Sequence, residues 1–463
     1  MPETDILDWL QTVSDSLGLT SPAVDCQLRK DIDNPARKRQ RLNPPTPDTS
    51  QSNMDSADQD TSPSKRGWAD GDYEERTPRA PSDNTRRFKV PRSESSLSQP
   101  SSSSRSQHGS GYSSPTKQLN QLAHDPRGVV VRDLLTLFPK PPELATLLNK
   151  IQHISRGRGI LPTSHRQSFD ALDTRSEAYH DWGWVQEGSL SDMHFSDQRQ
   201  DLGPTPPTDI VQRILYQANF CSNNGSSEAD WNTEVHHRLL EASLRPLEGV
   251  GKAQLIDFST TASIIPSYHA NRLQHKKVDF CLYIEPKCDS DCPRVSQKIE
   301  ELAATLPHQA FNHTGLPTLN TRPIALSIET KKSGEGWENA KLQMGIWNAA
   351  HWEFLQSLLR LKGQLPTPNK EHTAPEDKEV PSSSSTQQQL PLYLPGIIIQ
   401  GHDWHLIITT REDGKTLFWH KVTFGSTSSS MGIYQIICTL QLLRQWAKND
   451  YWSWLCAVVM DGD

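Results

Sequence analysis

Apolar residues recur with a regular spacing only in the C-terminal two-thirds of the chain. Within residues 231–244, Trp231, Val235 and Leu239 fall on one face of a helix. Residues 278–285 alternate apolar and polar positions, which is typical of a half-buried strand. Segments of both kinds are interleaved from about residue 128 onward, and this pattern predicts one mixed α/β domain.

The same patterns predict the individual elements. We expect helices at residues 129–137, 142–148, 210–215, 231–244 and 295–306, a long helix from the glycine-containing break at 333–336 to about 361, and a terminal helix at 431–454. We expect strands at residues 255–258, 278–285, 324–331, 397–410 and 417–424. The last two strands are expected to be antiparallel, because an Asp-Gly turn lies between them.

The N-terminal part of the chain lacks this periodicity. Between residues 91 and 115, twelve of twenty-five residues are serine. Such a segment cannot bury enough apolar surface to fold. We therefore predict a disordered tail over residues 1–127 and one domain over 128–463, with its core at about 205–455. A second polar segment, residues 366–389, predicts a mobile insert.

Two short segments of the tail differ from their surroundings. Residues 6–17 have the spacing of a short amphipathic helix, which is consistent with either a transient helix or docking to a protein partner. Residues 37–41 read Arg-Lys-Arg-Gln-Arg, a basic cluster typical of nuclear import or nucleic-acid binding. We therefore expect the protein in the nucleus, or otherwise in the cytoplasm.

The net charge, the longest apolar run and the number of cysteines of the whole chain limit the possible classes of function. The formal net charge of −7 excludes a uniformly basic nucleic-acid binder, so a nucleic-acid site would need a local patch or bound metal ions. No apolar run approaches the roughly 18 residues of a membrane-spanning helix, so we expect no membrane contact. Seven scattered cysteines are consistent with reduced thiols in cytosol or nucleus.

One set of polar residues on the predicted strands has a clear chemical meaning. Side chains alternate along a strand, so Glu329 and Lys331 share one face of residues 324–331. Asp279 lies on the polar face of residues 278–285. If the two strands are neighbours, Asp279 and Glu329 converge on one hard divalent cation, Mg²⁺ or Mn²⁺, beside Lys331. Taken alone, a Glu-x-Lys pair is more often a solvated strand face.

Other clusters have weaker signatures. Three cysteines and two histidines could imitate a zinc site, but their spacing fits no standard zinc signature: Cys281, Cys288, Cys292, His402 and His405. The serine-rich segment 426–430 lacks the Gly-Lys-Ser/Thr ending of a phosphate-binding loop, and a helix N-cap explains it better.

Asp279, then Glu329-Thr330-Lys331, then Gln343 on the next helix form an ordered set. This set resembles the PD-(D/E)XK nuclease superfamily, in particular the PD-(D/E)XK nuclease-like domain proteins of filamentous fungi. The resemblance covers roughly residues 170–455 and excludes the tail.

The resemblance implies an α/β fold with a restriction-endonuclease-like αβββαβ core, in which helices flank a mixed sheet. It implies that Asp279 and Glu329 bind the metal ion and that Lys331 orients or activates the attacking water. Gln343 would support the substrate or the site from the helix. The expected reaction is hydrolysis of phosphodiester bonds in nucleic acid, with DNA favoured over RNA.

Two features leave alternatives open. Many relatives use an acidic residue on the first core helix, where Glu228 and Glu234 are both candidates and Glu228 is weakly favoured. Val278 replaces the usual proline, and the separation between Asp279 and Glu329 is long. The alternative function is a catalytically silent nuclease-like domain that binds nucleic acid or protein; a third hypothesis is a purely scaffolding regulator.

Overall fold

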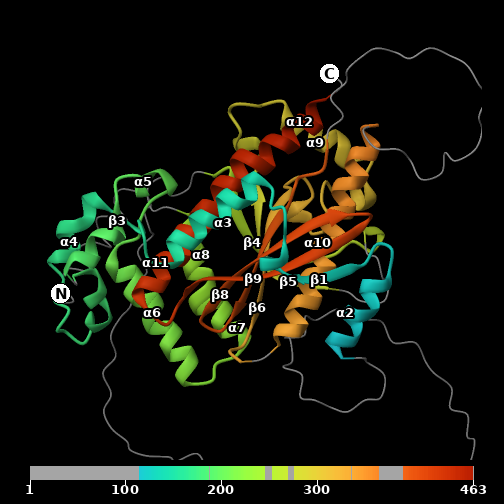
Figure 1. The fold of residues 1–463 in the computed structure, drawn as a ribbon. Helices are drawn as coiled ribbons and strands as arrows, with labels where there is room; N and C mark the ends of the chain where they lie inside the picture. Colours follow the sequence, from blue (N-terminus) through green and yellow to red (C-terminus); the bar gives the residue numbers. More distant parts are fainter. Residues whose placement is uncertain are drawn as a thin grey trace, which may run out of the picture. The chain divides into compact units, whose positions relative to one another are not determined.

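The computed structural model describes residues 114–186, 188–245, 253–268, 276–334, 336–363 and 389–461 (Figure 1). The expected disorder up to residue 113, with the helix at 6–17 and the basic cluster at 37–41, lies outside these residues. The predicted insert also lies outside them except for Gln389. Within the described ranges, every helix is too short or too polar to cross a membrane.

The described part consists of a central sheet with helices packed against it (Figure 1). The helices are α2 (Pro115–His124), α3 (Pro142–Ser155), α4 (Arg166–Asp170), α5 (Arg199–Leu202), α6 (Thr208–Asn223), α7 (Glu228–Trp231), α8 (His237–Leu244), α9 (Val295–Ala303), α10 (Trp337–Leu361), α11 (Ser430–Trp446) and α12 (Ser453–Met460). The strands are β1 (Val129–Asp133), β2 (Leu161–Pro162), β3 (Phe195–Ser196), β4 (Ile256–Ser263), β5 (Lys277–Ile284), β6 (Ile324–Lys331), β7 (Leu394–Gln400), β8 (Asp403–Glu412) and β9 (Lys415–Ser426). Two π-helical segments, η5 (Asn232–His236) and η10 (Ala447–Trp452), join α7 to α8 and α11 to α12.

Seven strands form one mixed sheet in the order β1-β9-β8-β7-β6-β5-β4. Strands β4, β5 and β6 pair antiparallel, α10 then crosses over, and β7 pairs parallel with β6. Together with the helical segment α7–η5–α8, this is the expected αβββαβ core. Strand β6 lies inside the sheet, and its side chains are buried on both faces up to Thr330, as is typical of a strand covered on both sides.

Two adjacent residues of β8 show that helices cover opposite faces of the sheet. The ring of Trp404 contacts that of His236 in η5, with centroids 5.8 Å apart. The ring of His405 contacts that of Trp337 at the start of α10, with centroids 5.2 Å apart. Because successive side chains point to opposite faces of a sheet, η5 and α10 lie on opposite sides of it.

The prediction of a helix at residues 129–137 is wrong. Strand β1 occupies Val129–Asp133 and pairs parallel with β9, and a single 3₁₀ turn follows at Leu134–Thr136. Three consecutive valines favour a strand, because their branched side chains restrict helical rotamers. A short apolar run does not distinguish a helix from a strand without the neighbouring strand.

Helix α2 lies before residue 128, the expected beginning of the domain. The Ser114 side chain accepts a hydrogen bond from the Lys117 backbone and caps the helix, with Pro115 at its first position. Leu119 and Leu122 are buried. Two apolar residues three positions apart therefore attach a serine-flanked helix to the domain.

The predicted strand at 397–410 is two strands. Strand β7 ends at Gln400 and β8 begins at Asp403, and Gly401 between them has a φ of +58°. Only glycine adopts this conformation without strain, so the turn interrupts an otherwise continuous apolar run. The predicted N-cap is confirmed: the Ser429 side chain accepts a hydrogen bond from the Gly432 backbone at the start of α11.

Candidate active site

Asp279 and Glu329 lie on neighbouring strands, as the two-strand hypothesis required. Strands β5 and β6 pair antiparallel with Phe280 opposite Ile328. Asp279 and Glu329 come one position further along this register, so their side chains project from the same face of the sheet. The two carboxylates are close enough that the charge of Asp279 raises the pKa of Glu329.

Thr330 holds the Asp279 carboxylate in place. The Thr330 backbone N–H and its hydroxyl both donate to Asp279 Oδ2, at 2.8 and 2.9 Å. Two hydrogen bonds to one oxygen fix the carboxylate, and these bonds do not engage the second oxygen. The middle residue of the Glu-x-Lys motif thus has a positioning role that alternation alone did not reveal.

Glu329 is a buried carboxylate with one satisfied oxygen. Its side chain is 1% exposed, and Lys331 Nζ donates to Oε1 at 2.5 Å. Its other oxygen, Oε2, is buried without a hydrogen-bond partner. Burial and the charge of Asp279 raise the pKa of Glu329 to about 8, against the opposing effect of Lys331. An unpaired buried oxygen is costly, and a cation placed there would satisfy it.

Lys331 lies between several acidic groups. Besides Glu329 it donates to the Thr330 carbonyl at 2.6 Å, and its Nζ lies 3.6 Å from Glu228 Oε2. Burial by itself would lower the pKa of Lys331, but Glu329, Glu228 and Asp279 outweigh that effect and raise the pKa. The ammonium group therefore stays charged at neutral pH.

A glycine turn brings α10 close to Lys331. Gly336 has a φ of +76°, and a Cβ added to it would lie 2.8 Å from the Lys331 Cδ atom. Any larger residue would therefore displace the lysine or strain the backbone. This close approach explains the glycine at position 336, five residues after Lys331.

The structure separates the two acidic candidates on the first core helix. Glu228 is the first residue of α7, and burial, together with Asp279 and against the opposing effect of Lys331, raises its pKa. Glu234 instead accepts a hydrogen bond from Arg238 at 2.8 Å, one helical turn away. Glu228 is thus the candidate that lies beside Lys331.

Gln343 is placed near the site without touching its charged groups. Its Nε2 atom donates to the backbone carbonyl of Lys277, two residues before Asp279, at the long distance of 3.5 Å. This bond connects α10 with the beginning of β5.

A family comparison adds independent information. The family model described as PD-(D/E)XK nuclease superfamily matches residues 179–452, more than half of the chain. The chain belongs to the PD-(D/E)XK nuclease superfamily. Comparisons with curated proteins and with solved structures found no significant match. The matched range includes Glu228, Asp279, Glu329, Lys331 and Gln343, and membership in the superfamily indicates a nuclease-like function and a nucleic-acid substrate in general terms.

Proteins of the PD-(D/E)XK superfamily typically use divalent metals. In the described ranges, no three or more His, Cys, Asp or Glu side chains form a metal-binding group. The site has two carboxylates on neighbouring strands, Asp279 and Glu329, and Glu329 Oε2 is buried and unpaired. Two carboxylates fit Mg²⁺, which keeps several water ligands, better than an ion that needs a complete protein cage.

The zinc alternative finds no support in the described residues. Cys281 is buried in β5, where burial raises the pKa of its thiol to about 12. The histidines make other bonds: His402 Nδ1 lies 3.0 Å from the Thr427 hydroxyl, and His405 Nδ1 lies 2.9 Å from the Thr423 hydroxyl.

Lys276 is a further charged residue that interacts with Glu329 and Lys331, and it was not predicted from the sequence. It directly precedes β5, and burial and the charge of Lys331 lower its pKa, whereas Glu329 opposes this shift. The signal in the sequence was a lysine three residues before Asp279 at the start of the strand. Its closeness to Glu329 arises only once β5 and β6 pair.

Proposed function

We propose that the protein is a metal-dependent nuclease that hydrolyses phosphodiester bonds, with DNA as its preferred substrate. The observation that carries the proposal is the state of Glu329. One oxygen is held by Lys331, the other is buried and unpaired, and the charge of Asp279 acts on the same carboxylate. A purely structural site gains nothing from leaving a carboxylate oxygen unpaired beside a like charge.

Asp279 and Glu329 would hold Mg²⁺ or Mn²⁺ in this proposal. When bound, the cation supplies positive charge that stabilises the negative charge developing on the phosphate oxygens. Thr330 contributes by fixing Asp279 through two hydrogen bonds. The orientation of the Asp279 carboxylate is therefore set before any ligand arrives, which avoids its reorganisation during the reaction.

Lys331 would act as a charged donor that orients the attacking water. Its raised pKa disfavours loss of the proton, so it is a poor general base in this state. A fixed ammonium beside the reacting phosphate stabilises the transition state by charge. Glu228 lies next to this ammonium and restricts its position, and Gln343 supports the strand that carries Asp279.

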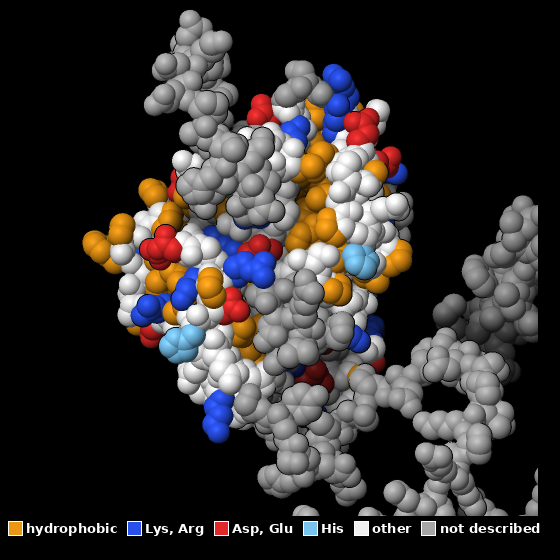
Figure 2. Space-filling view, turned by 90° about the vertical axis from the view of Figure 1, so that its right-hand side faces the viewer, with side chains coloured by type: hydrophobic (Ala, Val, Ile, Leu, Met, Phe, Trp, Pro, Cys, Tyr) orange, Lys and Arg blue, Asp and Glu red, His pale blue; other side chains and the backbone are white. Residues whose placement is uncertain are grey.

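The charge of the surface supports a role for the cation. Figure 2 shows acidic and basic side chains interspersed on one face of the described part. The formal charge of the chain is −7. A phosphate must therefore approach two carboxylates without help from a strongly basic protein, and a bound divalent ion would remove this repulsion.

Three further parts of the proposal rest on sequence alone. The basic cluster at residues 37–41 supports a nuclear location, and the helix expected at residues 6–17 supports a protein partner. The ordered motif set supports a relationship with the fungal PD-(D/E)XK nuclease-like domain proteins.

The proposal is tested by incubating the full chain with single- and double-stranded DNA and RNA. Reactions contain Mg²⁺, Mn²⁺ or a chelator, and the protein is wild type, Asp279→Asn or the control Glu234→Gln. We expect metal-dependent cutting that Asp279→Asn reduces by about a thousandfold or more, because it removes a charge aimed at the reacting centre. The control should cut like wild type, because Glu234 pairs with Arg238.

The same experiment has two outcomes that oppose the proposal. Trace cutting of equal rate in wild type and Asp279→Asn would show that the activity does not come from this site. Binding of nucleic acid without cutting, under every metal condition, would favour the alternative of a catalytically silent binding module.

A further inference from the structure

A groove lined by aromatic side chains lies where the chain enters β7. It consists of two adjoining hollows, each with a volume of about 360 Å³. Both hollows are bordered by the same four residues, Glu143, Tyr393, Trp446 and Asp450. We call this feature the aromatic groove. Each hollow has the size of a small-ligand site.

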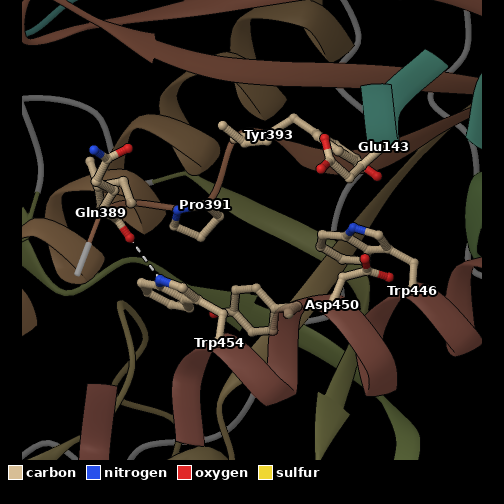
Figure 3. Close-up of a pocket in the computed structure, with 10 residues that line it drawn as sticks. Glu143, Gln389, Pro391, Tyr393, Trp446, Asp450 and Trp454 are labelled. Atoms are coloured by element: carbon tan, nitrogen blue, oxygen red, sulfur yellow. Dashed lines mark hydrogen bonds between the residues drawn. The ribbon is translucent and has the colours of Figure 1, made fainter. Parts of the chain in front are cut away.

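The wall of the aromatic groove is a row of four rings. Tyr393 and Trp446 have ring centroids 5.8 Å apart, Trp446 and Tyr451 5.7 Å, and Tyr451 and Trp454 5.9 Å. Trp454 Nε1 donates to the Gln389 carbonyl at 2.7 Å, which closes the row at one end (Figure 3). Rings in mutual contact form a firm, preformed surface.

Two carboxylates from different elements border this wall. Glu143 is the second residue of α3 and Asp450 belongs to η10. Figure 3 shows both on the same side of the hollow as Trp446, with Pro391 and Gln389 opposite. Burial and the charge of Glu143 raise the pKa of Asp450, and Lys150 on α3 opposes this shift. The two acids are therefore close enough to repel, and a cation between them would relieve that repulsion.

The aromatic groove is separate from the Asp279–Glu329 site. Strand β7 pairs parallel with β6, and Lys331 lies opposite Gln400, the last residue of β7. The groove residues Leu390, Leu392 and Tyr393 come just before its first residue, Leu394. A strand advances about 3.3 Å per residue, so the two features lie roughly 20 Å or more apart along β7.

We propose that the aromatic groove binds a partner peptide through an arginine or lysine side chain of that peptide. The cation would lie beside Glu143 and Asp450, which line the same hollow as the Trp454 ring, and an aromatic ring attracts positive charge. Leu392, 53% exposed at the groove, offers a surface for an apolar residue next to the cation. The charge complementarity and the open, two-part shape favour a peptide over a small free cation.

The test uses the full chain and an array of nine-residue synthetic peptides. The central residue is arginine, lysine, citrulline or norleucine, and the flanks are drawn from leucine, alanine and glycine. Binding is measured by fluorescence anisotropy with a label at the peptide terminus. Citrulline keeps the shape of arginine without its charge, so we expect citrulline and norleucine peptides to bind at least about tenfold more weakly than the basic ones.

Two variants then test the assignment to these residues. The double variant Glu143→Gln/Asp450→Asn should weaken binding of the arginine peptide by about tenfold or more, because both partner charges are lost. Lys150→Gln should tighten binding by about twofold to threefold, because it removes a like charge near Asp450. All three substitutions change exposed positions, and circular dichroism checks that the variants are folded.

Three results would overturn the proposal. The first is equal binding of citrulline and arginine peptides, which would show that the groove does not recognise the positive charge. The second is an unchanged affinity for the arginine peptide in the double variant, or a change of affinity in the same direction in the double variant and in Lys150→Gln. The third is the absence of binding above background for every peptide of the array.

Discussion

Two buried ion pairs of this sheet differ in how their charges are balanced. Arg411 on β8 donates to Glu353 of α10, with side chains 5% and 11% exposed, and Arg411 also donates to Gln356 and Thr416. Lys331 donates to Glu329, with side chains 13% and 1% exposed. Arg411 thus pairs with a single carboxylate, whereas Asp279 and Glu228 add further negative charge beside Lys331 and Glu329.

This difference separates a pair that holds elements together from a group that is poised for a ligand. The Arg411–Glu353 pair ties a helix to the sheet, and burial lowers the pKa of Arg411 while Glu353 opposes that shift. At Glu329, burial and the neighbouring carboxylates Asp279 and Glu228 raise the pKa to about 8, against the opposing effect of Lys331. Excess charge of one sign in a buried site is unfavourable for folding and is typical of functional sites.

The comparison predicts its largest effect for Lys331→Met. We expect cleavage to fall by about a thousandfold or more, because the charged donor beside the reacting phosphate is lost. The variant should still fold, because Glu329 can take up a proton once Lys331 is gone. Cleavage rates measure the loss of activity, and circular dichroism of the same preparation shows whether the variant is folded. A variant that is folded and fully active would remove Lys331 from the mechanism.

Arg411→Met tests whether the Arg411–Glu353 ion pair stabilises the fold. We expect the free energy of unfolding to fall by about 3–5 kcal/mol, because Glu353 is left charged and buried without its partner. Urea denaturation of Arg411→Met and Lys331→Met gives the two values side by side. If Lys331→Met loses as much stability as Arg411→Met, both pairs are structural and the distinction fails.

The third prediction concerns pH and the metal-free protein. Glu329 has a pKa of about 8 in the native state and 4.5 as its ordinary value, so the native state binds more protons between these values. Stability should therefore fall as pH rises from about 5 to about 9, on the order of 1–3 kcal/mol relative to Glu329→Gln. Denaturation in a chelator at several pH values measures the difference. If the unfolding free energy of wild type instead rises with pH relative to that of Glu329→Gln, the sign is opposite and the burial argument is contradicted.

Glu228→Gln should have the smallest effect. Glu228 lies 3.6 Å from Lys331 Nζ and is 38% exposed, so its loss weakens the positioning of the lysine without removing it. We expect cleavage to fall by about threefold to tenfold. Glu234→Gln, on the same helical segment, should leave the rate unchanged. Equal losses in both variants would indicate a general effect on the helix rather than a contact with Lys331.

Several parts of the fold could be predicted from local pattern. Strand β6 occupies residues 324–331 as predicted, and α10 ends at Leu361 as expected. Alternation also placed Glu329 and Lys331 on one face. These predictions succeeded because strand and helix periods are properties of the backbone and are visible in a single segment.

Other parts depended on contacts that the sequence does not display. Strand β1 was predicted as a helix, because its apolar run becomes a strand only by pairing with β9, nearly three hundred residues later. Helical phase did not choose securely between Glu228 and Glu234, and Glu228 was only weakly favoured. The choice between them follows from the position of Lys331, which belongs to a distant strand.

The sequence by itself determined which residue types share a face: Glu329 with Lys331 on one strand and Asp279 on the polar face of another. The tertiary structure decided that Glu329 is buried with an unpaired oxygen, that Lys276 lies near it, and that α3, η10 and the lead into β7 form the aromatic groove. The physical reason is that side-chain direction follows from local backbone geometry, whereas burial and electric field depend on residues brought together from the whole chain.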